Sequence, residues 1–169
     1  MMRSWLVFDG PIRHALHSLK YQRNLALGDA LAHNMAVFVG SLAWQVDVVV
    51  PIPLGKDRMK ERGYNQSGLV ARPLALLNHW HYSPRALTRV RETRTQVGLT
   101  PVERKENVSG AFRAVPEMVV GRTVLLLDDV ATTGATLAAG AASLIEAGAI
   151  TVYALSLARA LPHHGLTNV

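Results

Sequence analysis

The sequence contains no cysteine among its 169 residues, which excludes disulfides, a thiol nucleophile and a zinc–thiolate site. Long apolar runs are also missing: the most apolar window, residues 30–44, is too short and too polar to cross a bilayer. The first ten residues lack the pattern of a secretory signal. We therefore expect a cytoplasmic protein with no membrane insertion and no zinc.

Aromatic residues are scarce, at 6% of the chain, and they do not alternate with the arginines. A stacking platform for single-stranded nucleic acid is therefore not evident. The net charge is +6 and the pI is about 10.2. This balance favours anionic partners, among which phosphorylated metabolites and nucleic acid both qualify. A mildly basic surface without a function is the alternative.

Hydrophobic periodicity places the chain in the α/β class. Short apolar runs predict buried strands, and apolar residues at intervals of three and four predict helices. Residues 123–157 run strand–helix–strand, the unit that builds a parallel sheet. Residues 54–63 are rich in charge and residues 89–107 lack a convincing period, and both are predicted as loops. The predicted strands are 46–50, 123–127 and 150–157, and the predicted helices are 11–20, 25–43, 65–77 and 137–147.

Residues 124–136, VLLLDDVATTGAT, are the most informative stretch of the sequence. They place Asp128 and Asp129 at the carboxyl end of a predicted buried strand, where open parallel sheets bind ligands. The loop that follows enters a helix, and the unpaired N–H groups there can hold a phosphate. Carboxylates beside a phosphate favour sugar hydroxyls or Mg²⁺. The stretch therefore predicts a phosphorylated sugar site; the alternative is a strand that ends in solvated carboxylates before a capped helix.

This stretch resembles the phosphoribosyl pyrophosphate (PRPP) motif of type I phosphoribosyltransferases over its full length. The resemblance implies that Asp128 and Asp129 are the catalytic pair and contact the ribose hydroxyls. It implies a parallel-sheet fold with helices on both faces and a small N-terminal helical hood. It also implies a loop that binds the 5′-phosphate, formed by Ala131, Thr132, Thr133, Gly134, Ala135 and Thr136.

Further segments, in the same order along the chain, resemble the ComF/GntX family. These are residues 19–32, 49–67, 87–112 and the closing LAR at 157–159. The family is linked to DNA uptake in competence and to the use of DNA as a nutrient. Its members commonly begin with a four-cysteine zinc module, which this sequence lacks, so it is either a short form or a part of a longer one. We expect one domain over residues 1–169, with a hood at 1–45 and a core at 46–160.

Basic residues after the first predicted strand are candidates for pyrophosphate binding. The resemblance assigns this role to Lys56, Arg58 and Arg62, because guanidinium groups suit paired phosphate oxygens and lysine adds a point charge. The alternative is a solvated charged loop. Asn65 and Gln66, which come next, either position that loop or cap the following helix.

The long polar segment at residues 89–107 resembles the flexible loop that closes over PRPP in these enzymes. Closure would exclude water from an activated sugar. A disordered loop and a strip that contacts a nucleic-acid backbone are the alternatives. The residues that carry the resemblance, and that we expect to belong to this loop, are Arg91, Thr93, Gln96, Arg104 and Asn107.

The resemblance favours transfer of phosphoribosyl from PRPP to an unidentified acceptor. Mg²⁺ is expected to arrive with PRPP, with Asp128 and Asp129 as the protein groups that could contact it. The alternative is a non-catalytic protein that senses PRPP or handles single-stranded DNA beside a competence helicase-like protein. A homodimer is compatible with either function. Tyr21 is a candidate for stacking on a base, although a buried tyrosine is the simpler interpretation.

Overall fold

The computed structural model describes residues 1–22, 24–91 and 100–161. Its centre is a five-stranded sheet in which every neighbouring pair of strands is parallel. The order is β1 (Met2–Val7), β7 (Thr151–Arg159), β6 (Thr123–Ala131), β2 (Val48–Pro51) and β3 (His81–Tyr82). The predicted α/β fold with a parallel sheet is confirmed.

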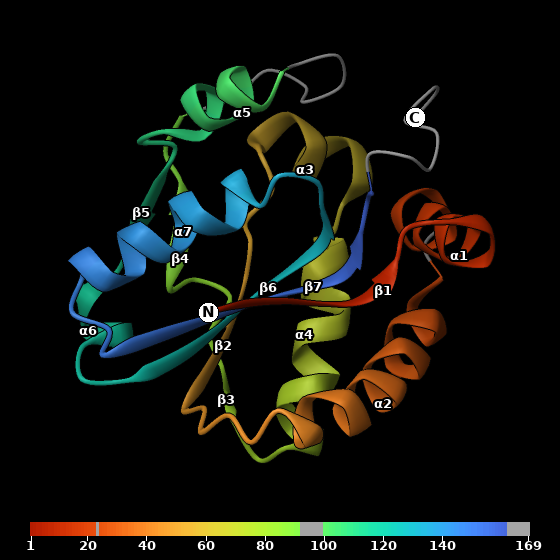
Figure 1. Cartoon of the computed structure of the whole chain (residues 1–169), viewed down its shortest axis with the longest axis horizontal. Coiled ribbons are helices and arrows are strands. Elements are labelled where there is room, and N and C mark those ends of the chain that lie inside the picture. The colour runs from red at the N-terminus through yellow and green to blue at the C-terminus, as the bar shows by residue number, and fades with distance from the viewer. Residues whose placement is uncertain (23, 92–99, 162–169) are drawn as a thin grey trace.

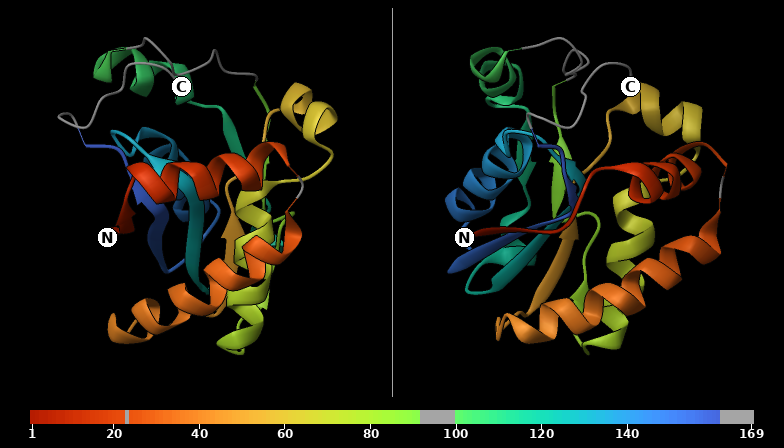
Figure 2. Two further views of the ribbon diagram at one scale, coloured as in Figure 1. Left: turned by 90° about the vertical axis from the view of Figure 1, so that its right-hand side faces the viewer. Right: turned by 45° about the vertical axis from the view of Figure 1, so that its right-hand side comes forward.

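Helices cover both faces of this sheet (Figures 1 and 2). One face packs against α1 (Gly10–Tyr21), α2 (Leu25–Ser41) and α4 (Gln66–Leu77). The other face packs against α7 (Ala135–Glu146) and a small antiparallel sheet of β4 (Leu87–Arg89) and β5 (Phe112–Ala114). Two short helices lie near that small sheet in sequence, α5 (Pro101–Val108) and α6 (Pro116–Val119).

The central strand β6 is apolar on both sides because both of its faces are covered. Leu125 and Leu127 belong to the cluster under α1, α2 and α4. Val124 and Leu126 point the other way, into the cluster under α7. Burial on both faces fixes the register of the strand, so its carboxyl end delivers the following residues to a defined place.

Two predicted loops contain helices instead. Residues 54–63 include α3 (Lys56–Arg62), which starts after Gly55 and ends at Gly63, where φ is 76°. The charged residues between these glycines are good helix formers, and a left-handed glycine is a common helix end. The segment 89–107 begins in β4 and ends in α5, and its residues 92–99 lie outside the described part.

The N-terminal residues form β1, a strand that the sequence analysis did not predict. Met2–Val7 pairs with β7 along the edge of the main sheet. The segment 1–45, predicted as a helical hood, therefore also contributes a strand to the main sheet. Its two helices, α1 and α2, are helical as predicted. The strand was missed because its apolar and polar residues do not alternate clearly. Among the described residues, none of the helices combines the length and the apolar character needed to span a membrane.

Candidate functional site

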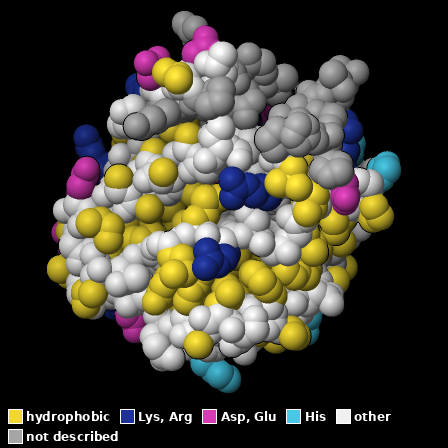
Figure 3. Space-filling view, viewed as in Figure 1, with side chains coloured by type: hydrophobic (Ala, Val, Ile, Leu, Met, Phe, Trp, Pro, Cys, Tyr) yellow, Lys and Arg dark blue, Asp and Glu magenta, His cyan; other side chains and the backbone are white. Residues whose placement is uncertain are grey.

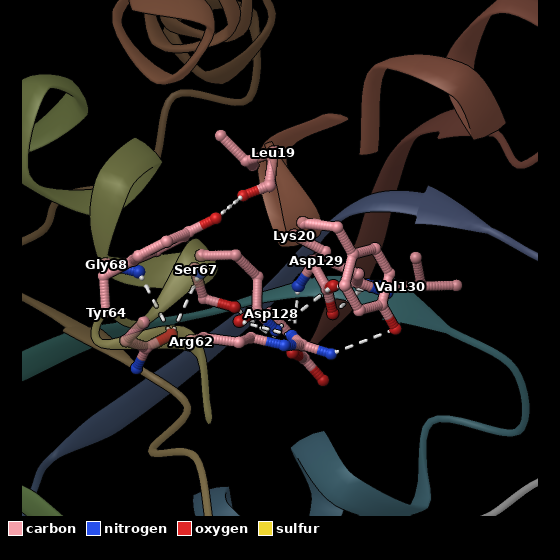
Figure 4. A network of polar contacts seen from close by, with 12 residues as sticks. Leu19, Lys20, Arg62, Tyr64, Ser67, Gly68, Asp128, Asp129 and Val130 are labelled. Carbon is pink, nitrogen blue, oxygen red and sulfur yellow. Dashed lines mark hydrogen bonds and ion pairs between the residues drawn. The ribbon is translucent and has the colours of Figure 1, made fainter. Parts of the chain in front are cut away.

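Asp128 and Asp129, the acid pair, lie near the carboxyl end of β6 and are both buried, with 8% and 7% of their surface exposed. The alternative of solvated carboxylates is therefore wrong. A buried carboxylate is costly unless other groups balance its charge or donate hydrogen bonds to it. The partners of the pair come from α1, α4 and the β6 backbone (Figure 4).

Asp129 is held by three donors. The Nζ atom of Lys20, in the last turn of α1, lies 2.8 Å from Oδ2. The side chain of Gln66, the first residue of α4, donates from Nε2 to the same oxygen at 3.3 Å. The other carboxylate oxygen, Oδ1, accepts a hydrogen bond from the backbone N–H of Val130 at 2.8 Å. Both oxygens are thus engaged, and the carboxylate has a fixed orientation.

Asp128 has weaker and fewer partners. Its Oδ1 accepts from the backbone N–H of Asp129 at 2.9 Å and from Ser67 Oγ at 3.4 Å. Burial, together with the adjacent charge of Asp129, raises the pKa of Asp128 from 3.8 to about 8. Burial is the largest influence on Asp129 and acts to raise its pKa, but the charge of Lys20 and the hydrogen bonds from Lys20, the Val130 N–H and Asp128 together outweigh it, so the pKa of Asp129 is lowered. At neutral pH the pair therefore carries one negative charge, which Lys20 balances.

Asp129 is a member of a ring of contacting side chains that also contains Lys20, Gln66, Arg62 and Tyr21. Gln66 Oε1 accepts from Arg62 Nη1 at 3.0 Å, and Arg62 Nη2 donates to the hydroxyl of Tyr21 at 3.4 Å. The Arg62 guanidinium also lies 5.0 Å from the centre of the Tyr21 ring, within range of a cation–π contact. Because Lys20 and Tyr21 are neighbours on α1, these contacts form a closed ring. Arg62 Nε is the one buried side-chain nitrogen or oxygen without a partner in the described part of the chain.

The start of α4 fixes two members of this site. The Asn65 side chain caps the helix by accepting from the N–H groups of Ser67 and Gly68, at 3.0 and 3.4 Å. Its amide also donates to the carbonyl of Ile52, just beyond β2, at 2.8 Å. The cap therefore ties the first turn of α4, and with it Gln66 and Ser67, to the end of the neighbouring strand.

The turn between β6 and α7 contains a left-handed glycine and leads directly into a helix. Gly134 has φ of 81°, a left-handed conformation that disfavours other residues. A Cβ atom there would lie 2.8 Å from Met2 Sδ, so the turn packs closely against β1. Thr133 Oγ1 accepts from the N–H of Ala135, where α7 begins. The predicted phosphate-binding role of this loop stays a prediction.

The three predicted pyrophosphate residues all lie on α3, but their surroundings differ. Arg62 joins the ring around the acid pair, whereas Lys56 and Arg58 lie exposed on α3. Tyr21 is 55% exposed, so its interpretation as a buried tyrosine is wrong.

Only part of the predicted closing loop can be placed. Arg91 Nη2 donates to the carbonyls of Asn107 and Ser109, at 3.1 and 2.6 Å, and so joins the two ends of the segment. Thr93 and Gln96 lie outside the described residues, and Arg104 belongs to α5 but its side chain is not described.

Sequence reasoning did not assign Lys20, Gln66 or Ser67 to the acid pair. Lys20 lies in the family segment 19–32, close to the predicted N-terminal hood, and nothing in that segment points to the acid pair. A polar pair directly after a helix-capping asparagine was the available signal for Gln66 and Ser67. No sequence pattern links these residues to Asp129, because the contacts join positions that are 63 residues apart in the case of Gln66.

The described residues contain no group of three or more histidines or acids that could hold a metal ion. Mg²⁺ is commonly bound through one or two carboxylates together with the phosphates of a substrate. The acid pair supplies two carboxylates, so a metal ion held there would need further ligands from a bound molecule.

Two curated proteins show where the chain belongs. It is 38% identical over 162 residues to the DNA utilization protein YhgH of Salmonella typhimurium, which covers 91% of this chain and 70% of that protein. It is 36% identical over 119 residues to competence protein F of Haemophilus influenzae, which covers 68% of this chain and 51% of that protein. No family model matches the sequence.

A solved structure supports the same assignment at the level of fold. The glutamine PRPP amidotransferase of B. subtilis superposes with a TM-score of 0.51 at 26% identity, over 83% of this chain and 26% of that longer chain. Its fold, and the relationship to YhgH and competence protein F, agree with the resemblance that the motifs carry. The chain belongs to the ComF/GntX family of type I phosphoribosyltransferase-like proteins, together with YhgH and competence protein F.

Proposed function

We propose that this protein binds PRPP together with Mg²⁺ and transfers the phosphoribosyl group to an acceptor. The observation that carries the proposal is the buried acid pair at the carboxyl end of β6, followed at once by the left-handed turn at Gly134 and the start of α7. Carboxylates and a helix start within a few residues of each other suit a ligand with hydroxyls at one end and a phosphate at the other.

The acid pair offers complementary chemistry to a ribose diol. Asp129 is an oriented carboxylate that can accept hydrogen bonds, and its charge is already balanced by Lys20. Asp128 has a pKa of about 8, so at neutral pH it is mostly protonated and can both donate and accept. Two ionised carboxylates would repel the phosphates of PRPP, and this arrangement presents only one.

The groups around the acid pair would bind the anionic parts of PRPP. The N–H groups at the start of α7 would hold the 5′-phosphate, with Thr132, Thr133 and Thr136 as hydroxyl donors. Lys56 and Arg58, exposed on α3, would reach the pyrophosphate once it is bound. Arg62 Nε is a buried donor without a protein partner, and a ligand oxygen would satisfy it.

Transfer would need charge stabilisation more than proton transfer. The bond between the anomeric carbon and the pyrophosphate breaks, and the sugar becomes cationic while the leaving group becomes more negative. The Asp129 carboxylate would favour the sugar cation, and the basic side chains of α3 would favour the leaving pyrophosphate. When bound, Mg²⁺ would supply further neutralisation of the pyrophosphate.

A role beside DNA is the second candidate function, and the names of the relatives favour it. YhgH is called a DNA utilization protein and competence protein F a competence protein. We propose that the PRPP-dependent activity serves the same processes. On the face in Figure 3, lysine and arginine side chains stand apart among apolar and uncharged groups. Direct contact with a DNA backbone would call for a continuous basic surface, which the described atoms of this face do not form.

Calorimetric titration of PRPP and Mg²⁺ into the protein tests the proposal. We expect saturable binding in the wild type and loss of binding in Asp128→Asn/Asp129→Asn, because the ribose contacts disappear. Asp29→Asn, an exposed acid on α2, is the matched control and should bind like the wild type. Release of pyrophosphate when candidate acceptors are added would then establish turnover. Failure of the wild type to bind PRPP would refute the proposed function.

A further inference from the structure

We propose that Lys20 is a positioning residue of the ribose site: its ammonium group orients the Asp129 carboxylate and balances its charge where an anionic ligand binds. This inference rests on the proposed function, and it adds a residue of α1 to a site built mainly from β6 and α7. The contact that carries it is the 2.8 Å ion pair between Lys20 Nζ and Asp129 Oδ2.

The environment of the ion pair makes its geometry specific. The side chains of Lys20 and Asp129 are 21% and 9% exposed, so the pair is largely shielded from water. Gln66, on α4, donates to the same carboxylate oxygen at 3.3 Å. Figure 4 shows Lys20 directed at Asp129. A shielded ion pair with a second donor orients a carboxylate more firmly than an exposed one, which water and salt would weaken.

The last turn of α1 is itself held in place, so Lys20 does not depend on the ion pair alone. The hydroxyl of Tyr64 donates to the carbonyl of Leu19 at 2.7 Å. Arg62 contacts Tyr21 through the hydroxyl at 3.4 Å and through the ring face. Leu19, Lys20 and Tyr21 thus each contact a different residue. Two of these partners, Arg62 and Tyr64, lie just before α4 in the chain. Lys20 is presented to Asp129 from a fixed backbone.

The charge of Lys20 matters because the neighbouring loop, between β6 and α7, would bind a phosphate. A carboxylate without a counter-ion, beside a phosphate, would repel it. With Lys20 in place, the carboxylate can accept hydrogen bonds from neutral hydroxyls without adding net negative charge to the site. Removing the ammonium group should therefore weaken binding of a ligand that contacts the ribose site, and weaken much less a ligand that does not.

The test compares PRPP with pyrophosphate, each with Mg²⁺, by calorimetry. We expect Lys20→Met to weaken PRPP binding about tenfold, the loss typical of one charge-assisted contact, and to weaken pyrophosphate binding less than about twofold. Lys20→Arg keeps the charge and should recover most of the affinity. Arg122→Met removes one positive charge just before β6, at the opposite end of that strand, and should bind PRPP like the wild type.

The outcomes separate this inference from the proposed function. If the wild type binds PRPP and Lys20→Met binds it equally well, the inference is wrong and the proposed function stands. An equal loss for PRPP and pyrophosphate would indicate a general effect and would also overturn the inference. If the wild type does not bind PRPP, both fail. Should Lys20→Met not fold, Lys20→Gln, which keeps a polar side chain without the charge, should show the same tenfold loss.

Discussion

The two predicted ends of the PRPP site differ in how firmly the protein holds them. At the β6 end, the acid pair is buried and its partners come from α1, α4 and the backbone. At the α3 end, Lys56 and Arg58 are exposed on a helix of seven residues, and only Arg62 is built into the ring. The ribose end is thus organised before any ligand arrives, whereas Arg58 is an exposed side chain that a ligand would orient.

This difference indicates how binding energy would be used. Fixed partners around Asp129 remove the entropic cost of orienting that group when the sugar binds. An exposed arginine side chain such as Arg58 loses conformational entropy on binding, but it can follow a pyrophosphate that moves away as it leaves. Substitutions at the β6 end should therefore change folding stability as well as ligand affinity, whereas substitution of the exposed Arg58 on α3 should change ligand affinity with little effect on stability.

The largest effect is expected from Asp128→Asn, and it is stabilising. The pKa of Asp128 is raised from 3.8 to about 8, so its contribution to stability is fully present below pH 4 and is lost as the pH rises through 8. Asparagine resembles the protonated acid and has no such cost. We expect the free energy of unfolding above pH 8 to be higher than in the wild type by several kcal/mol.

Thermal or urea unfolding across the pH range would check this expectation. The gain should shrink toward zero near pH 4, where both forms of residue 128 are neutral. A stability difference that does not depend on pH would contradict the assignment of Asp128 as the group with the raised pKa.

Asp129→Asn should have the opposite sign. It leaves the Lys20 ammonium, only 21% exposed, without its counter-ion, and we expect a loss of about 2 kcal/mol at pH 7. Because the pKa of Asp129 is lowered, the wild-type contribution is present above about pH 4, the ordinary value, and is lost as the pH falls through the folded pKa.

Urea unfolding of Asp129→Asn, of Lys20→Met and of the double variant measures the coupling between the two residues. The double variant should recover part of the loss, because neither charge is then left alone. Strictly additive effects would show that the ion pair does not form in solution.

The smallest effect on stability is expected from Arg58→Gln on α3. Arg58 is exposed, so the free energy of unfolding should change by less than about 0.5 kcal/mol. Affinity for PRPP with Mg²⁺ should nevertheless fall about tenfold, because a guanidinium donor to the pyrophosphate is lost. If Arg58→Gln lost as much stability as Asp129→Asn, the claim that the two ends of the site differ in their contribution to folding would be wrong.

Local patterns in the sequence predicted the parallel sheet and the position of the acid pair. The run of aliphatic residues before Asp128 required a buried strand, and the strand direction placed the acids at its carboxyl end. The burial of the acids and the ion pair to Lys20 could not be predicted, because they depend on the packing of α1 and α4 over that end. The edge strand β1 was missed because its residues do not alternate clearly, and because its pairing with β7 joins Met2 to Ala154 across most of the chain.

The most direct test of the central claim is to map PRPP binding onto the isotope-labelled protein by NMR, with Mg²⁺ present. If PRPP binds as proposed, the largest changes in amide chemical shift should fall on residues 128–136 and on Lys20 and Gln66. The amide signals of residues at the opposite end of β6, such as Arg122, should not change. Shifts that avoid the acid pair and the Gly134 turn, or no shifts at saturating PRPP, would contradict the claim that these residues form a PRPP site.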